Sequence, residues 1–378
     1  MSDTHLHIIA FNVPFPVDQG GIFDVFYKIK ALHALGIKIH LHCFDYGKGE
    51  DATLDKYCYA VHYYKRLRGF NAFSLSLPYI VSSRYNKQLF DELLKDNYPI
   101  LMEGVHTSYL LLDKRFINRI CLLRLHNTEF RYYKELASHA KSFFRKCYFH
   151  WESYLLKAYE KRIANKAVLL SITATDEGVY KTLFGAKRTH TIPLFLADNW
   201  APKEKDPNGA YCLYHGDLSI DSNEQMAIWL LTKVFSKLSI PFVIAGRNPS
   251  PKLEKQAHVL GHTCLVANPT EHEMQDMIAK AHINIVPSLT TTGIKIKLVN
   301  ALINGRHCIS NTAGIGGSEL DSICTKADTA EEFIQLITQL FSLPFSSDEM
   351  NRRMALIQTT FNNEKGARFI QELMVGSK

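Results

Sequence analysis

The sequence predicts an α/β protein built from two doubly wound parallel sheets. Short, β-branched apolar runs alternate with longer segments in which apolar residues recur at helical spacing. Repeated β-then-α units of this kind favour a parallel sheet that is covered by helices on both faces. A polar stretch with prolines and alternating charges lies near the middle of the chain, and 378 residues are enough for two domains with separate cores.

The first half opens with a strand, a loop and a helix. HIIAFNV (His7 to Val13) is typical of a buried strand, and the loop PFPVDQGG leads into a helix predicted from Ile22 to Gly36. Gly20 and Gly21 end this loop and would let the backbone come close to a ligand, although a tight turn into the helix explains them equally well.

Two features of the first half can each be interpreted in two ways. The pairs His5/His7 and His40/His42 lie in predicted strands without a carboxylate or cysteine at ligand spacing, so we expect packing or surface placement rather than a metal site. The long helix predicted over residues 141–167 interleaves aromatic and basic residues, which would suit an anionic membrane surface. Ordinary packing is the interpretation that we favour for it.

The bulk composition is that of a globular protein, with 46% apolar and 21% charged residues. A formal charge of +7 suits an anionic small molecule or an acidic membrane face, and no zinc-finger, basic-zipper or RNA-binding signature appears, so nucleic acid is not an expected partner. The eight cysteines are scattered without a C-x-x-C, which indicates neither disulfides nor a zinc site. The opening residues do not have a signal-peptide pattern, and we expect the protein in the cytoplasm or at the inner face of the membrane.

Polar residues follow two predicted strands of the first half. The strand ICLLRL runs directly into His126, and Glu129 follows three positions later, while Glu103 and His106 follow the strand PILM in the same manner. Open α/β sheets bind ligands at the carboxyl ends of their strands. These four residues are therefore candidate site residues, although a helix cap formed by Asn127 or Thr128 would also explain the first group.

The most informative stretch runs from Thr290 to Gly317. A buried strand is predicted before it, and a helix from Ile294 to Ile303 is stopped by Asn304 and Gly305. A strand, a Thr/Gly loop and a helix in this order bring free backbone N–H groups and the positive end of a helix dipole to one point, where an anion can bind. Lys295 and Lys297 lie in the first turn, and ordinary solvated lysines are the alternative.

Three motifs resemble one protein family: PFPVDQGG, LHNTE and GIKIKLVNAL. They resemble the retaining glycosyltransferases of group 1 (glycosyltransferase family 4-like), whose GT-B architecture consists of two Rossmann-like domains facing a cleft. The resemblance implies an acceptor-binding domain over residues 1–200, a linker at 201–209 and a nucleotide-sugar-binding domain over 210–359. It also implies that a C-terminal helix at about 360–378 returns to the first domain.

The resemblance implies roles for the candidate residues. His126 would lie near the transferred sugar, with Glu129 beside it, and Glu103 and His106 would lie on the acceptor side. The commoner branch of the family has an Arg and a Lys after the first strand of the second domain, and both are missing here. The donor site would therefore use residues from several loops: Gly20, Gly21, Arg247, Lys252, Thr292, Gly293, Lys295, Lys297 and Asn300.

One departure from the family lies in the donor segment. Most members have two glutamates eight positions apart, and Thr292 and Asn300 stand in their places. Asn300 can still hydrogen-bond ribose hydroxyls. The loss of both carboxylates motivates an alternative, a non-catalytic relative that binds a nucleotide-sugar or a partner enzyme. A nucleotide-sugar 2-epimerase is a second alternative, although its chemistry should need more carboxylates.

The expected function is that of a hexosyltransferase in cell-surface polysaccharide or glycan synthesis. It would move a sugar from a nucleotide-diphosphate sugar to a hydroxyl of a glycan or lipid-linked acceptor, with retention, and with peripheral contact to a membrane. We expect no cofactor and no metal, because the chain has no D-x-D motif for a divalent ion. Cationic side chains and helix N-termini would instead stabilise the departing diphosphate.

Overall fold

The structure is a computed structural model that describes residues 4–17, 20–200 and 206–375. It contains two compact units. Unit 1 comprises residues Met1–Ala137, Phe144–Ala197 and Phe361–Lys378, and unit 2 comprises Ser138–Phe143 and Asp198–Thr360. Most of the predicted linker, residues 201–205, lies outside the described residues.

Unit 1 is built on a parallel sheet of seven strands in the order β3-β2-β1-β4-β5-β6-β7. Its strands are β1 His5–Ala10, β2 Lys38–Asp45, β3 Ala60–Lys65, β4 Ile100–Glu103, β5 Cys121–Leu125, β6 Val168–Ser171 and β7 Thr189–Thr191. Its helices are α1 Gly20–Ala34, α2 Tyr79–Ser82, α3 Lys87–Leu93, α4 Glu129–His139, α5 Phe143–Ile163, α6 Ala174–Phe184 and α14 Asn363–Met374.

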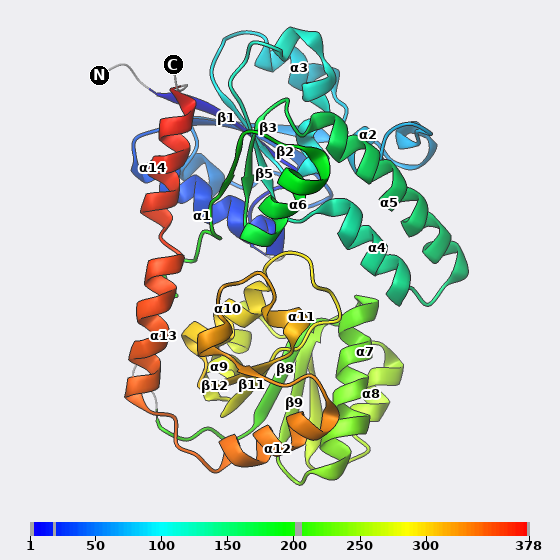
Figure 1. Ribbon diagram of the computed structural model, residues 1–378, viewed down its shortest axis with the longest axis vertical. Helices are drawn as coiled ribbons and strands as arrows, with labels where there is room; N and C mark the ends of the chain where they lie inside the picture. Colours follow the sequence, from blue (N-terminus) through cyan, green and yellow to red (C-terminus); the bar gives the residue numbers. More distant parts are fainter. Residues whose placement is uncertain (1–3, 18–19, 201–205, 376–378) are drawn as a thin grey trace. The chain divides into compact units, whose positions relative to one another are not determined.

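Helices cover both faces of this sheet. One face packs against α1 and α14, and the other packs against α2, α3, α5 and α6 (Figure 1). The C-terminal helix α14 thus lies against α1, although it follows unit 2 in the sequence. Both faces of the sheet are apolar, which explains why the strand sequences are nearly continuous apolar runs.

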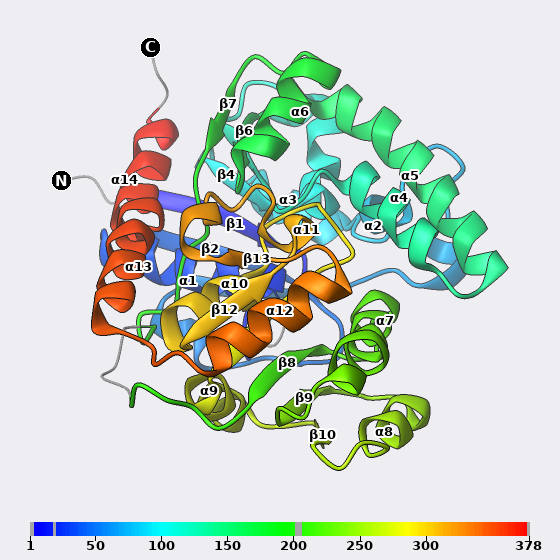
Figure 2. The same cartoon turned by 60° about the horizontal axis from the view of Figure 1, so that its bottom comes forward.

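Unit 2 repeats the plan with six parallel strands in the order β10-β9-β8-β11-β12-β13 (Figure 2, where β8, β9 and β10 follow one another). Its strands are β8 Cys212–Asp217, β9 Phe242–Arg247, β10 Thr263–Ala267, β11 Ile283–Ile285, β12 His307–Ser310 and β13 Thr325–Lys326. Its helices are α7 Asp221–Trp229, α8 Pro251–Ala257, α9 Glu271–Lys280, α10 Ile296–Asn304, α11 Thr312–Ile315, α12 Ala330–Phe341 and α13 Ser347–Thr360.

The strand order decides where each unit can bind a ligand. In both sheets the order reverses beside the first strand, between β1 and β4 in unit 1 and between β8 and β11 in unit 2. The crevice outside the carboxyl ends of the strands at such a switch point is the usual binding place in doubly wound sheets. The predicted fold class is confirmed, and each unit has one expected site.

A ladder of five histidines crosses β1, β2 and β3. His5 and His7 contact His40 and His42 of the neighbouring strand, with ring nitrogens 2.9 Å apart in both pairs, and the ring of His42 stacks on that of His62. We call these residues the histidine ladder. The predicted packing role of the two pairs is confirmed, since their rings bond one another across the sheet.

Within the described residues, no helix combines the length and apolar composition needed to cross a bilayer. The predicted long helix is present as α5, whose first half is largely exposed and whose second half packs into unit 1.

Candidate functional site

The loop between β11 and α10 lies at the carboxyl edge of unit 2's sheet. Gly293 has a φ of 65°, a left-handed conformation in which a residue with a side chain would be strained. Lys295 is the N-cap residue of α10, and its ammonium group donates to the carbonyl oxygen of the buried Thr292 at 2.5 Å. The loop therefore folds back on the helix start, where the first N–H groups have no intrahelical acceptor.

Lys297 lies in the first turn of α10 and points inward. Its ammonium nitrogen is shielded from solvent, and no atom of the described residues accepts a hydrogen bond from it. The nitrogen lies 4.9 Å from the centre of the Tyr214 ring, which is a cation–π contact. Burial, together with the charge of Lys295, lowers the pKa of Lys297 to about 7. An ammonium without a counter-ion at a helix N-terminus is a favourable place for an anion.

His215 lies beside Lys297 on β8, the strand at the switch point of unit 2. Its Nε2 atom is buried without a hydrogen-bond partner among the described residues. Burial and the charge of Lys297 lower the pKa of His215 to about 3, so the ring is neutral at physiological pH. A neutral imidazole can donate one hydrogen bond to a ligand without adding charge.

The remaining donor-side candidates are spread along the same sheet edge. Arg247 ends β9 and is exposed, and Lys252 is exposed in the first turn of α8. Asn300 is buried within α10, and its side-chain oxygen accepts from Asn304 at 2.7 Å. Only Lys295 and Lys297 therefore flank the helix start directly.

Unit 1 contains a buried charge cluster, which we define as Asp24, Lys28, Glu103 and Arg124. The carboxylate of Asp24 accepts from Lys28 at 2.8 Å and from Arg124 at 2.9 Å, and Lys28 reaches Glu103 at 2.9 Å. Burial alone would raise the pKa of Asp24, but Arg124 and Lys28 hold it well below its usual range. Two carboxylates and two cations thus neutralise one another inside the unit.

His126 extends the cluster toward the carboxyl end of β5. Its Nε2 lies 3.0 Å from a carboxylate oxygen of Glu103. Burial would raise the pKa of Glu103, but Lys28 and the hydrogen bond from His126 lower it, so Glu103 is the acceptor and Nε2 donates. Glu103 is fully buried, and it contacts Lys28 and His126 rather than a space that an acceptor could enter. Its position is that of a residue that orients the His126 ring.

Phe11 connects three of the other candidates of unit 1. A Cβ atom on Gly21 would lie 2.6 Å from the Phe11 ring, so the absence of a side chain at Gly21 allows α1 to approach that ring. Gly20, one position earlier, is exposed. The Phe11 ring also stacks on His106 with centroids 5.2 Å apart and meets His126 edge-on at 5.6 Å.

Glu129 begins α4 and is buried. The backbone N–H groups of Glu129 and Phe130 donate to the carboxylate of Glu160, each at 3.0 Å, so a side chain of α5 caps α4. Burial and the neighbouring Glu160 raise the pKa of Glu129 to about 8. Its carboxyl is therefore a proton donor near neutral pH, and it is buried rather than exposed at the sheet edge.

Asp24, Glu103 and His126 place three potential metal-ligand atoms within 4.8 Å of one another. The ammonium of Lys28 already contacts both carboxylates, and the guanidinium of Arg124 contacts Asp24. A divalent ion would have to displace Lys28. The residues present do not fit a metal, and we derive no step through one.

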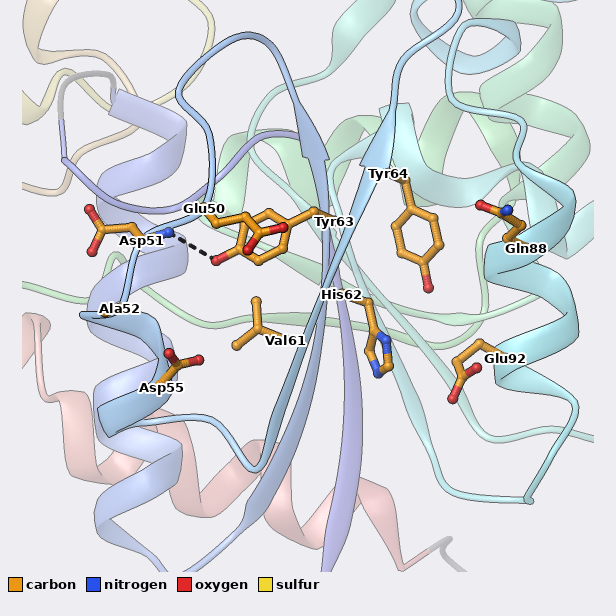
Figure 3. A pocket seen from close by; sticks show the side chains of 10 residues that line it. All are labelled: Glu50, Asp51, Ala52, Asp55, Val61, His62, Tyr63, Tyr64, Gln88 and Glu92. Atoms are coloured by element: carbon orange, nitrogen blue, oxygen red, sulfur yellow. Dashed lines mark hydrogen bonds between the residues drawn. The ribbon is translucent and has the colours of Figure 1, made fainter.

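A separate depression of about 720 Å³ lies along the edge strand β3 and contains none of the predicted site residues. Figure 3 shows Val61 and Tyr63 on one side of this strand and His62 and Tyr64 on the other. Four carboxylates line it, those of Glu50, Asp51, Asp55 and Glu92. Such a lining repels a diphosphate, so the depression is not a donor site.

The sequence-based prediction missed Asp24, Lys28, Arg124 and His215. The signal was present for the first three: Asp24 and Lys28 are charged residues four apart in an apolar helix, and Arg124 interrupts the apolar strand CLLRL. Charged residues in segments that must be buried need partners. No comparable signal marks His215.

Much of unit 2 matches a known protein family. A profile of the family described as "Glycosyl transferases group 1" matches residues 209–342, which span the loop and helix around Lys297. Residues 209–342 are therefore similar to the group 1 glycosyltransferases. A curated relative, the "uncharacterized 44.6 kDa protein in cps region" of Klebsiella pneumoniae, is 27% identical over 332 residues, which cover 82% of this chain and 84% of the relative.

Solved structures share the fold over nearly the full length of the chain. TarM has a TM-score of 0.69 at 11% identity, with 99% of each chain covered. WaaG, a glycosyltransferase involved in lipopolysaccharide biosynthesis, has a TM-score of 0.68 at 11% identity, with 98% of this chain and all of that chain covered. Anabaena Alr3699/HepE, solved with UDP and glucose, has a TM-score of 0.64 at 11% identity and the same coverage. The predicted GT-B architecture is confirmed.

Proposed function

We propose that the protein transfers a hexose from a nucleotide-diphosphate sugar to a hydroxyl group of a cell-surface glycan. Unit 2 binds the donor and unit 1 the acceptor. The observation that carries the donor half is the shielded ammonium of Lys297 at the N-terminus of α10, inside the segment that matches the family profile. Support for a surface glycan comes from the relative in a cps region and from the involvement of WaaG in lipopolysaccharide biosynthesis.

The donor diphosphate would be held by Lys297, Lys295 and the first N–H groups of α10. These groups are fixed before the reaction, so they can stabilise the charge that develops on the leaving diphosphate without reorganising. Arg247 and Lys252 would contribute from the ends of β9 and α8, and Gly20 and Gly21 would allow the α1 loop to approach the phosphates. Asn300 and Thr292 would face the nucleoside and the sugar. No metal or other cofactor is part of this proposal.

On the acceptor side, His126 would contact the hydroxyl that is glycosylated. Its Nε2 donates to Glu103, which leaves Nδ1 as the ring nitrogen that would face the acceptor hydroxyl. Glu129, with a pKa raised to about 8, would keep a proton available behind the ring. We propose a retaining outcome, on the resemblance of the donor segment to the retaining family.

The experiment is a titration of the full chain with UDP and with GDP, followed by an assay for donor hydrolysis and sugar transfer. Lys297→Met should weaken binding of the preferred diphosphate by about tenfold or more, because a charge-assisted hydrogen bond is lost. Lys280→Met is the matched control, since this lysine is exposed on α9 and paired with Asp276. Failure of both diphosphates to bind would refute the donor site.

A second candidate function is that of a binder without catalysis. The observation that favours it is the presence of Thr292 and Asn300 where the family has glutamates, together with the engagement of Asn300 by Asn304. Tight diphosphate binding without hydrolysis or transfer of any donor sugar would support this candidate. Turnover of a donor would exclude it.

A further inference from the structure

The carboxyl edge of unit 1's sheet carries a row of cationic and aromatic side chains. Parallel strands end at the same edge, and the residues that follow β3, β2, β1, β4 and β5 lie along it in that order. From the β3 side to the β5 side, the row contains Arg66, Tyr46, Phe11, His106 and His126. We call it the edge row.

Contacts run continuously along the edge row. The guanidinium of Arg66 lies between two rings, 4.7 Å from the centre of Tyr46 and 5.2 Å from that of Tyr79. Arg84, which is buried beneath the row, donates to the Tyr46 hydroxyl and, at 3.1 Å, to the carbonyl oxygen of Phe11. The ring of Phe11 then stacks on His106. The stacked rings preorganise Arg66, which limits the entropy that binding would otherwise cost.

Arg66 and Arg84 give the edge row and the region beneath it a positive charge. Among the residues that the structure describes, no carboxylate forms an ion pair with Arg66 or Arg84, whose hydrogen bonds go to neutral oxygens. Arg84 is 5% exposed, and burial lowers its pKa to about 10. Nearby Asp24 and Glu103, by contrast, are each paired with a cation.

Two groups of the row have unused hydrogen-bonding capacity. Arg66 is only half-buried, and among the described residues its five N–H donors make one hydrogen bond, from Nε to the Ser83 hydroxyl at 2.9 Å. The Nδ1 atom of His106 is buried without a partner among the described residues. The charges of Arg84, His126 and Arg66 lower the pKa of His106 further below the value that burial gives it, so its ring stays neutral. A ligand that carries negative oxygens would satisfy both groups.

We propose that the edge row is an acceptor subsite for a negatively charged sugar, with Arg66 as the residue that binds its carboxylate or phosphate group. The aromatic rings of Tyr46 and Phe11 supply apolar surface for the sugar ring, and the guanidinium of Arg66 supplies a planar fork for the anion. The positive charge of Arg84, which is buried beneath the row, makes the local electrostatic potential more positive. The inference rests on the proposed function, since it names the chemical class of that acceptor.

The test measures binding to the full chain by titration calorimetry with two pairs of probes. The first pair is a glucuronate-containing tetrasaccharide and the same tetrasaccharide with its carboxylates reduced to alcohols. The second pair is glucose 6-phosphate and glucose. The charged member of at least one pair should bind about tenfold or more tightly than its neutral partner, and the pair that responds distinguishes a carboxylate from a phosphate ligand.

Substitutions test whether Arg66 causes the preference for the charged sugar. Arg66→Met should remove the preference for charge without changing the affinity for the neutral sugar, and Arg66→Lys should keep part of it, because the charge remains while the fork is lost. Arg188→Met is the matched control: Arg188 is exposed just before β7, at the amino edge of the same sheet. Circular dichroism of each variant verifies that the fold is retained.

The inference is overturned if charged and neutral probes bind alike, if neither binds, or if Arg66→Met and Arg188→Met give the same result. UDP and GDP titrations of the same preparations keep the two proposals separate. Diphosphate binding without a preference for charged sugars would refute the subsite alone, whereas loss of diphosphate binding would refute the donor site.

Discussion

The buried ammonium of Lys297 costs the protein electrostatic free energy. A buried ammonium without a carboxylate partner is costly, and its position at the positive end of α10 adds to the cost. Lys295 lies two residues away and lowers the pKa of Lys297 further. A bound diphosphate would remove all three penalties together, so binding and protonation of Lys297 should be linked.

Proton uptake tests this linkage. The pKa of Lys297 is about 7 in the free protein and should rise well above 8 beside a diphosphate, so the protein should take up roughly half a proton per diphosphate at pH 7 and nearly one at pH 8. Titration calorimetry in buffers with different ionisation enthalpies measures the number directly. The Lys297→Met protein should show less uptake than the Lys280→Met control. Equal uptake in both variants would show that another group binds the proton.

Asp24 is the residue that holds unit 1's buried charge cluster together, since it accepts from Lys28, Arg124 and the backbone N–H of Phe195. Asp24→Asn should lower the free energy of unfolding of unit 1 by about 3–5 kcal/mol, because it leaves buried cations without a counter-ion. Hydrogen exchange of the β5 amides reports on this unit specifically.

The control for Asp24 is Glu364→Gln on α14, which breaks an exposed pair with Arg368 in the same unit. We expect its effect to stay below about 1 kcal/mol. If the two variants were equally stable, the cluster would not contribute to the fold.

At the level of single residues, the sequence identified residues of the right chemical type, but it did not predict which of them are buried. It identified Lys295 and Lys297 as an adjacent pair, but their environments differ because residues two apart on a helix point in different directions. The ammonium group of Lys295 donates to the loop carbonyl of Thr292, whereas the ammonium group of Lys297 is buried inside unit 2. Glu103 was predicted at a strand end, where it lies, but its partner Lys28 comes from a helix far away in the sequence and no local pattern could reveal the pairing.

Among the structural elements, the histidine ladder has the clearest dependence on pH. Burial lowers the pKa of His7 to about 4, although Asp96 opposes the shift, and His40 and Arg119 add to it. Burial also lowers the pKa values of His40 and His42. In the folded protein, His7, His40 and His42 therefore bind protons only at a lower pH than the same histidines do in an unfolded chain.

The sign of the effect follows from linkage. Between pH 6.5 and pH 4 the unfolded chain binds more protons than the folded one, so acidification destabilises unit 1, by about 3 kcal/mol from His7 alone. Above pH 6.5 these histidines should not make the free energy of unfolding depend on pH. Urea unfolding followed by exchange of the β1 and β2 amides at several pH values measures the change.

Variants distinguish the ladder from other acid-sensitive groups. His7→Asn should flatten the pH dependence between pH 6.5 and pH 4. His190→Asn, on β7 near the opposite edge of the same sheet, should leave it unchanged. An unaltered slope in the His7 variant would assign the acid sensitivity elsewhere.

Most elements could be predicted from the sequence because their apolar spacing is local. The helix predicted from Ile294 to Ile303 is α10, Ile296–Asn304, and the helix predicted from Ile22 to Gly36 is α1, Gly20–Ala34. Of the edge row, the sequence analysis predicted His106 and His126 at strand ends, but not Arg66, Tyr46 or Phe11. Its members follow five different strands, and the strand order brings them together.

At the scale of the whole molecule, one face of unit 1's sheet is covered by helices from distant parts of the chain. The face of unit 1 that α1 covers also requires α14, whose Ala367, Ile370 and Met374 are buried there. Ile370→Ala should therefore destabilise unit 1 by about 2–5 kcal/mol, although Ile370 follows unit 2 in the sequence. Hydrogen exchange should accelerate in α1 and not in β8 of unit 2.

Lys365→Ala is the control for Ile370, because Lys365 is exposed on the same helix. It should leave exchange in α1 unchanged. Accelerated exchange in β8 after the Ile370 substitution would show that the two units do not unfold separately.

The position of α14 also has a consequence for synthesis of the protein. The chain leaves unit 1 after Ala197 and re-enters it only at Phe361. While the ribosome makes the intervening segment, the apolar face beside α1 has no cover, and unit 2 can finish folding first. The nascent unit 1 should therefore be a client for chaperones until translation ends, and a ribosome stalled before Phe361 would expose a protease-sensitive α1.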